Sequence, residues 1–254
     1  MFDANDYADV ADIYDAYVRA DFDLAFFGNR VAGCAGPVLE LMAGTGRVTR
    51  AICPANRDLT SIDISVAMLR SLTLSLRDSF PSLNVVCADI RNLPLKSNHF
   101  ELAIIPFNSF SELTTTRDQR SALGAIRRTL THEGQLICTL HNPAIRLPSL
   151  DGREKSFGSF DLSGDRRLQL WVRGSFDNQA GLARSTQTYR IYDERDELLE
   201  ERLQSVMFAL ITREEFEVLA QSEGYQIVEL LGDYDGSPFS AGESPYMIWT
   251  LETA

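Results

Sequence analysis

Three consecutive segments that predict buried strands each end in residues able to hold a ligand. The first, 37–41, runs into a turn containing Gly44 and Gly46, and turn glycines let the backbone approach a ligand closely. Asp63 ends the second segment, where a carboxylate could accept two hydrogen bonds from a ribose diol. Asp89 follows the third. Because parallel strands end at one edge of a sheet, we expect a ligand site there.

The glycine turn has two other interpretations. A tight connection between a strand and a helix can need glycine for its backbone conformation alone. The dinucleotide pattern GxGxxG, placed on residues 44–49, puts Thr49 in the third position, where glycine or alanine is needed for helix and strand to pack. An NAD-dependent oxidoreductase is therefore the less favoured reading of a nucleotide site.

The elements that would position these residues alternate between short apolar runs and helical patterns, which is typical of a parallel sheet. We expect an α/β fold with a Rossmann-like, seven-stranded sheet, helices on both faces and an inserted antiparallel sheet. The predicted strands are 37–41, 58–63, 84–88, 100–106, 135–140, 225–231 and 246–251, and the predicted helices are 47–52, 66–80, 116–130 and 212–224.

The regions outside this sheet give the expected domain plan. Apolar residues at helical spacing within 3–15 predict an amphipathic N-terminal helix, and alternation within 151–205 predicts three antiparallel strands. We expect one domain over 1–254. It would comprise cap helices in 1–36, a core formed by 37–150 and 206–254, and a lid formed by 151–205.

Composition excludes several classes of function. With 36 acidic and 24 basic residues the formal net charge is −12, which disfavours nucleic acid as a partner. The four cysteines form no CxxC pair, and no other pattern predicts a metal site. No run of apolar residues is long enough to span a membrane, and the N-terminus lacks the features of a secretory signal. We expect a cytoplasmic protein that does not bind membranes.

Several segments resemble class I S-adenosylmethionine-dependent methyltransferases. ELMAGTGR is similar to the glycine motif of that family, SIDISVAML to its ribose-acid motif, ADIRNLPL to its adenine-edge motif and FELAIIPFNSF to its fourth-strand motif. The strands inserted after the fifth strand and the closing GDYDGSPF and SPYMIW resemble the small-molecule branch, which includes glycine and amino-sugar N-methyltransferases. The resemblance implies S-adenosylmethionine as cofactor and a small-molecule acceptor.

The resemblance also implies a set of cofactor residues. Asp63 would hold the ribose hydroxyls, the glycines would line the methionine part, and Asp89 with Ile90 would border the adenine. The family often has glycine where Met42 stands, which is a departure. The full implied set is Tyr14, Glu40, Ala43, Gly44, Thr45, Gly46, Arg47, Asp63, Ile64, Met68, Ala88, Asp89, Ile90, Pro106, Phe107 and Asn108.

The acceptor side is expected at the ends of the later strands. His141 follows the fifth strand and could take a proton from an acceptor, while the resemblance places Tyr14 beside the cofactor. Trp171, Arg173 and Tyr189 are the candidate acceptor residues of the lid.

We therefore expect methyl transfer to a nitrogen or oxygen of a small molecule. The alternative is a non-catalytic S-adenosylmethionine- or S-adenosylhomocysteine-binding regulatory subunit. Apolar residues of the lid could pack against a second copy of the chain, so a homodimer is a further possible state.

Overall fold

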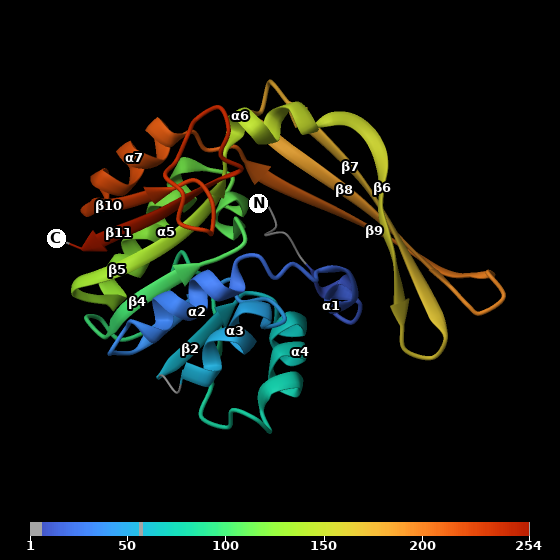
Figure 1. Cartoon of the computed structure of the whole chain (residues 1–254), viewed down its shortest axis with the longest axis horizontal. Coiled ribbons are helices and arrows are strands. Elements are labelled where there is room, and N and C mark those ends of the chain that lie inside the picture. The colour runs from blue at the N-terminus through green and yellow to red at the C-terminus, as the bar shows by residue number, and fades with distance from the viewer. Residues whose placement is uncertain (1–6, 56–57, 254) are drawn as a thin grey trace.

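The structure, a computed structural model, describes residues 7–55 and 58–253, and it is built around a seven-stranded sheet. The strand order is β10-β11-β5-β4-β1-β2-β3, with β1 to β5 parallel and β11 antiparallel to both of its neighbours (Figure 1). The predicted sheet is confirmed. The strands are β1 Val38–Leu41, β2 Leu59–Asp63, β3 Asn84–Cys87, β4 Phe100–Ile105, β5 Leu130–His141, β10 Tyr225–Leu231 and β11 Tyr246–Thr253.

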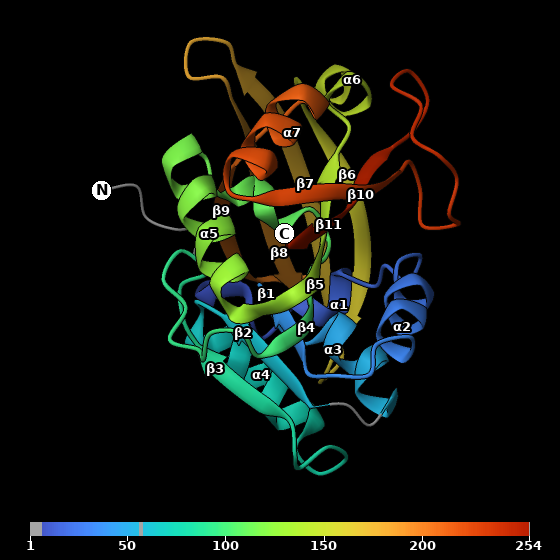
Figure 2. The ribbon, with the colours of Figure 1, turned by 90° about the vertical axis from the view of Figure 1, so that its left-hand side faces the viewer.

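Helices cover both faces of this sheet because its central strands are apolar on both sides. On one face, α5 (Thr116–Thr129) and α7 (Arg213–Ser222) bury residues such as Leu123 and Phe216 against the strands. On the other, α2 (Leu24–Ala32) and α3 (Arg47–Ile52) bury Phe27 and Val48 (Figure 2). α4 (Val66–Leu76) packs beside β2 and β3. The ends of β1, β2 and β4 are thereby held in a rigid frame.

A second, antiparallel sheet of four strands follows β5 and the short α6 (Pro143–Arg146). We call it the inserted sheet: β6 Asp151–Leu162, β7 Arg166–Asp177, β8 Leu182–Tyr192 and β9 Leu198–Ala209. Three strands were predicted, because β6 is mostly polar and exposed and alternates only over its last few residues. β9 also continues to Ala209, beyond residue 205, where the lid was expected to end.

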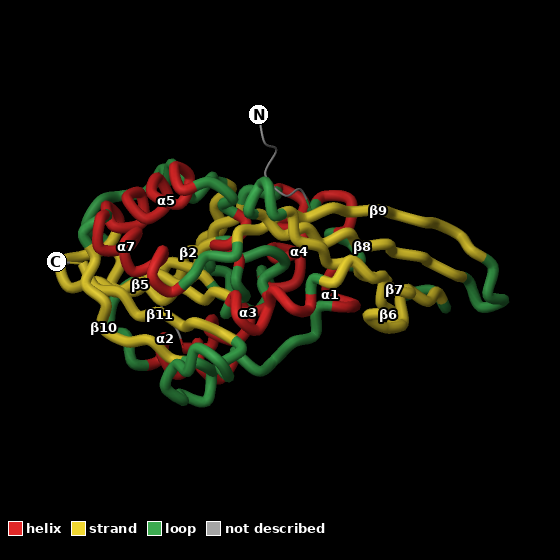
Figure 3. Tube along the Cα trace, turned by 90° about the horizontal axis from the view of Figure 1, so that it is seen from above, coloured by secondary structure: helices red, strands yellow, loops and turns green. Residues whose placement is uncertain are grey.

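The N-terminal segment lies between the two sheets (Figures 1 and 3). It forms the 3-10 turn η1 (Ala8–Val10) and α1 (Tyr14–Tyr17), in place of the single helix predicted over 3–15, and residues 3–6 of that prediction lie outside the described part. Val10, Ile13 and Tyr17 pack against the inserted sheet. The apolar spacing is therefore satisfied by contacts with β7 and β8 and does not require a continuous helix.

No helix in residues 7–55 and 58–253 is both long and apolar enough to cross a membrane. Within the same ranges, no three His, Cys, Asp or Glu side chains form a group that could hold a metal ion.

Candidate functional site

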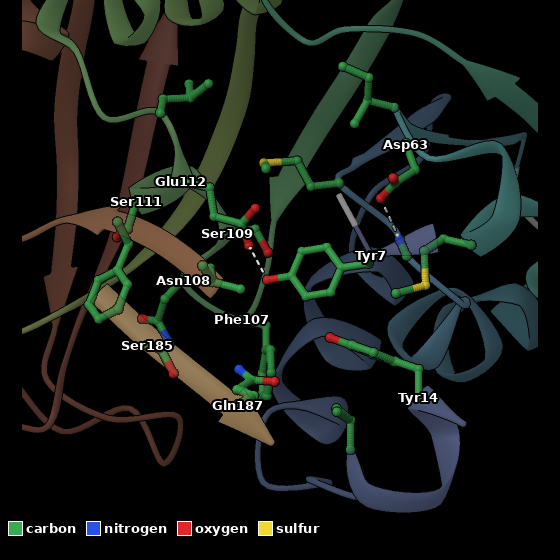
Figure 4. Close-up of a pocket in the computed structure, with 18 of the residues that line it drawn as sticks. Tyr7, Tyr14, Asp63, Phe107, Asn108, Ser109, Ser111, Glu112, Ser185 and Gln187 are labelled. Atoms are coloured by element: carbon green, nitrogen blue, oxygen red, sulfur yellow. Dashed lines mark hydrogen bonds between the residues drawn. The ribbon is translucent and has the colours of Figure 1, made fainter. Parts of the chain in front are cut away.

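A cavity of about 620 Å³ lies where the carboxyl edge of the main sheet meets the N-terminal segment and the inserted sheet (Figure 4). Its walls come from parts of the chain that are far apart in sequence. Among the residues predicted to bind a ligand, those that line it are Tyr14, Gly44, Asp63, Ile64, Met68, Ala88, Asp89, Ile90, Phe107, Asn108 and His141.

The turn after β1 has three residues in the left-handed region, at φ +57° for Met42, +58° for Gly44 and +88° for Gly46. Only glycine adopts this region without strain, which gives a physical reason why a glycine at position 42 would be favoured. A Cβ on Gly44 would meet nothing within 4 Å, whereas one on Gly46 would lie 2.8 Å from Cγ of Leu72. Gly44 thus leaves space for a ligand, while Gly46 allows the turn to pack on α4.

The carboxylate of Asp63 is fixed by two backbone groups. Its Oδ2 accepts a hydrogen bond from the N–H of Gly44, and its Oδ1 accepts one from the N–H of Ser65, both at 2.8 Å. Burial raises the pKa of Asp63, although these backbone hydrogen bonds act in the opposite direction. A carboxylate oxygen can accept a further hydrogen bond, so both oxygens remain usable by a ligand.

Asp89 and Ile90 also line the cavity, but the carboxylate of Asp89 already has a partner. The guanidinium of Arg91 lies 2.5 Å from Asp89 Oδ2 and 3.2 Å from Asp118 Oδ1. The hydrogen bonds from Arg91 hold the pKa of Asp89 below its ordinary value. Asp89 is therefore an ionised residue in the wall of the cavity, and the guanidinium of Arg91 balances its charge.

The turn after β4 stores backbone strain at the cavity. Phe107 and Asn108 both have positive φ, at +59° and +61°, and neither is glycine. The N–H of Asn108 donates to Oγ1 of Thr139 at 3.0 Å, which holds the turn in place. Within the described residues, the buried Oδ1 of Asn108 has no hydrogen-bond partner. The strained turn thus presents an acceptor at the wall of the cavity that no described residue uses.

The N-terminal segment contributes aromatic residues to the cavity. Tyr14 and Tyr7 both line it, with their ring centroids 5.9 Å apart in an edge-to-face contact. The hydroxyl of Tyr7 donates to Oε1 of Glu112 at 2.9 Å (Figure 4). Burial raises the pKa of Tyr14 well above its ordinary value, so its hydroxyl stays protonated at neutral pH.

The side chains of Arg47 and Thr45, which belong to the set predicted to bind the cofactor, contact residues that precede β1. Arg47 forms a two-bond ion pair with the buried Asp23, at 2.5 and 2.7 Å, and its guanidinium stacks 4.6 Å from the ring centroid of Phe107. Thr45 donates to Oδ1 of Asp15 at 2.5 Å. Neither residue lines the cavity, because both side chains point to neighbours that flank it.

Glu40 does not line the cavity either, because it lies inside the sheet. Its Oε2 accepts hydrogen bonds from Thr49 at 2.5 Å and Ser61 at 2.8 Å, and its buried Oε1 has no partner among the described residues. Burial raises its pKa to about 7, against the lowering effect of these hydrogen bonds. Ala43, Gly46 and Pro106 likewise lie next to the cavity without lining it.

The acceptor residues predicted on the inserted sheet lie elsewhere. Leu170 and Val172 line the cavity, so Trp171 and Arg173, at the alternate positions of β7, face the opposite side of the sheet. Tyr189 is on the cavity side but is covered, with its hydroxyl 3.0 Å from that of Tyr17. The alternation of residue types along these strands predicted that the sheet has two faces, but it did not indicate which face lines the cavity. The inserted sheet lines the cavity with Phe157, Leu170, Val172, Ser185, Gln187, Val206 and Phe208.

His141 lines the cavity at the end of β5, next to Arg146 of α6. Burial, with a smaller effect of Arg146, lowers the pKa of His141 to about 4. Its ring stacks on that of Tyr246 with centroids 6.2 Å apart. The imidazole is therefore neutral at pH 7 and can accept a hydrogen bond.

The polar lining residues that escaped prediction include Tyr7, Ser111, Glu112 and Arg146. Ser111 and Glu112 directly follow the turn after β4, so their place after a strand at the ligand edge was a usable signal. Tyr7 and Arg146 carried none, because their position depends on how the N-terminal segment and α6 pack.

Residues 38–134 match a family model described as a methyltransferase domain. YqeM of Bacillus subtilis (strain 168), which carries a provisional name as a methyltransferase, is 25% identical over 214 residues, covering 81% of this chain and 80% of YqeM.

Solved structures of methyltransferases superpose along almost the whole chain. An S-adenosylmethionine-dependent methyltransferase from Clostridium acetobutylicum ATCC 824 has a TM-score of 0.80 at 18% identity, covering 98% of this chain and 99% of that one. The sugar N-methyltransferase KedS8 from Streptoalloteichus sp. ATCC 53650 has a TM-score of 0.75 at 17% identity, covering 94% and 92%. At these identities the likeness shows a shared fold, which includes the inserted sheet.

Proposed function

This chain carries a methyltransferase domain over residues 38–134 and has the fold of S-adenosylmethionine-dependent methyltransferases, and we propose that it transfers a methyl group from S-adenosylmethionine to a nitrogen or oxygen of a small molecule. The observation that carries the proposal is the Asp63 carboxylate. Two backbone N–H groups fix it at the edge of the cavity beside the open space over Gly44.

The strand-end side of the cavity fits the donor. Asp63 retains acceptor capacity on both oxygens for the two hydroxyls of a ribose. Ile64, Met68 and Ile90 provide apolar surface near it for a base. The orphaned Oδ1 of Asn108 suits the ammonium group of a methionyl tail, which is a donor without acceptor capacity.

S-adenosylmethionine supplies a methyl group on a sulfonium, which is already activated for transfer. The task left to the chain is to align the acceptor with the methyl group and to exclude water. Phe107, Leu170 and Phe208 provide apolar walls for this purpose, and Tyr14 closes the cavity from the N-terminal side.

An acceptor nitrogen must present a free lone pair to the methyl group. The imidazole of His141 is neutral at pH 7 because its pKa is about 4, so it can accept a hydrogen bond from an acceptor N–H or O–H. With that pKa it is a weak proton acceptor, and its role is to orient the nucleophile. Ser111, Ser185 and Gln187 offer further hydrogen-bonding groups on the acceptor side (Figure 4).

A small acceptor is supported by the size of the cavity and by its cover, since about 620 Å³ must hold both reactants beneath the inserted sheet. KedS8, which shares the inserted sheet, is a sugar N-methyltransferase. We therefore place a polar small molecule, methylated on nitrogen or oxygen, at the head of the acceptor classes to be tried.

The direct test is transfer of labelled methyl groups from S-adenosylmethionine to a metabolite extract, followed by identification of the labelled product. We expect a labelled small molecule with the wild-type chain and none with Asp63→Ala. Binding of S-adenosylmethionine without labelling of any product would instead indicate a regulatory binding subunit. Binding of NADH with no binding of S-adenosylmethionine would contradict the proposal altogether.

A further inference from the structure

Arg146 stands at the acceptor side of the cavity with most of its hydrogen-bonding capacity unused. Its Nη1 donates to Oγ of Ser149 at 3.0 Å, and its guanidinium lies 5.6 Å from the ring centroid of Phe208. Its Nε is buried and has no hydrogen-bond partner among the described residues. A guanidinium carries five N–H donors, and the buried Nε–H of the half-buried Arg146 is costly to leave unpaired unless a ligand completes it.

Arg146 also lacks a counter-charge. In the described part of the chain no carboxylate oxygen lies within 4.0 Å of it. The acids of the cavity have other partners, since Asp89 and Asp118 pair with Arg91, and Glu112 accepts the hydroxyl of Tyr7. Partial burial lowers the pKa of Arg146, and no carboxylate of residues 7–55 and 58–253 acts against that effect.

We propose that Arg146 binds an oxyanion of the acceptor molecule, a carboxylate or a phosphate. The proposal rests on the proposed function, because it assigns the chemistry of the acceptor in the same cavity. The planar guanidinium matches either group through two parallel N–H bonds. The apolar ring of Phe208, whose centroid lies 5.6 Å from the guanidinium, lowers the local polarity and strengthens such a pair.

The other arginines of the cavity do not offer this site. Arg91 is paired with Asp89 and Asp118, and Arg19 is exposed to solvent beside Phe160. The net charge of −12 repels anions at long range, but salt screens that effect beyond about 10 Å. Selection of an anionic acceptor therefore depends on the local contact with Arg146.

The test uses simple aromatic probes on the full chain. Benzoate carries a carboxylate, phenyl phosphate carries a phosphate, and benzamide is a neutral counterpart of similar shape. Calorimetric titrations are run with and without bound S-adenosylhomocysteine. We expect at least one anion to bind the wild type and benzamide to bind at least tenfold more weakly, and the stronger anion identifies the group that the site takes.

Variants then assign the binding to Arg146. Arg146→Gln should weaken the anion at least tenfold, Arg146→Lys should retain part of the affinity, and Arg153→Gln, which removes an exposed arginine of β6, should change nothing. Thermal unfolding checks that each variant folds. The proposal is overturned if neither anion binds the wild type, or if benzamide binds as tightly as the anions do. It is also overturned if Arg146→Gln binds the anion with the affinity of the wild type.

These outcomes separate the two proposals. If the wild type does not bind S-adenosylhomocysteine, the proposed function is contradicted. The anion titrations run without S-adenosylhomocysteine still test the role of Arg146 in that case. An anion site that fails beside normal S-adenosylhomocysteine binding would remove only the inference about the acceptor.

Discussion

The backbone N–H of Gly44 donates a 2.8 Å hydrogen bond to Oδ2 of Asp63, which joins the turn after β1 to the end of β2. The carboxylate proposed to hold the cofactor is thus oriented by the same residue that leaves space for it. Geometry at this edge is set by backbone groups at the ends of two adjacent strands of the sheet.

Gly44 and Gly46 should respond differently to alanine. Both have positive φ, which costs roughly 1–2 kcal/mol for an alanine. Gly46→Ala adds a contact of 2.8 Å with Cγ of Leu72, so its free energy of unfolding should fall further than that of Gly44→Ala. Gly44→Ala should instead weaken S-adenosylmethionine at least tenfold. Urea unfolding and calorimetry measure both effects, and the reverse ranking of the two stabilities would contradict this division of roles.

Glu40 should make stability depend on pH. Its pKa is raised from the ordinary 4.5 to about 7 in the folded chain, so the folded state holds a proton that the unfolded state has lost between these values. Stability from this group is full below about pH 4.5 and is lost as pH rises through about 7. Glu40→Gln should therefore gain on the wild type by up to roughly 3 kcal/mol between pH 4.5 and 8. Urea unfolding across this range tests it, and parallel pH profiles for the two proteins would refute it.

Tyr14→Phe separates a role in the reaction from packing. The variant keeps the ring contacts with Tyr7 and Tyr17 and removes only the hydroxyl that lines the cavity. We expect kcat/KM to fall at least tenfold while the thermal unfolding midpoint stays within a few degrees. Unchanged turnover and unchanged cofactor affinity would leave Tyr14 as a packing residue.

Val206 lines the cavity on β9, and Ser205 precedes it on the other face of the inserted sheet. Val206→Trp should fill the acceptor side and lower kcat/KM for the acceptor at least tenfold, with the Kd of S-adenosylmethionine within about threefold. Ser205→Trp is the matched control and should leave both unchanged. A loss of cofactor binding in folded Val206→Trp would mean that the inserted sheet also covers the donor.

The ligand edge of the sheet could be predicted from the sequence because it depends on which residues directly follow each parallel strand. Gly44, Asp63 and Asp89 each follow a buried parallel strand, and strands of that kind end on one side of a sheet. The apolar composition of the short segments, and their alternation with helical patterns along the chain, were enough to predict the parallel strands. Once the strand order is set, the backbone brings these residues together without help from distant contacts.

Other parts of the site depend on packing that no local pattern records. Trp171 and Arg173 were chosen over Leu170 and Val172 because they are polar or aromatic, yet the inward face of the inserted sheet is the apolar one. Arg47 follows the glycine turn directly but turns to a buried Asp23 that precedes it by a whole strand. Such choices are made by tertiary partners and not by residue type or spacing.

Calorimetric binding of S-adenosylmethionine to the wild type, Asp63→Ala and the exposed control Asp78→Ala is the most direct test of the proposed function. The wild type and Asp78→Ala should bind equally, while Asp63→Ala loses two hydrogen bonds to a charged acceptor, each contributing about 1.5–3 kcal/mol. Its Kd should rise roughly a hundredfold or more, with folding checked by thermal unfolding. A change of less than about threefold in folded Asp63→Ala, or no binding by the wild type, would contradict a cofactor site at this edge of the sheet.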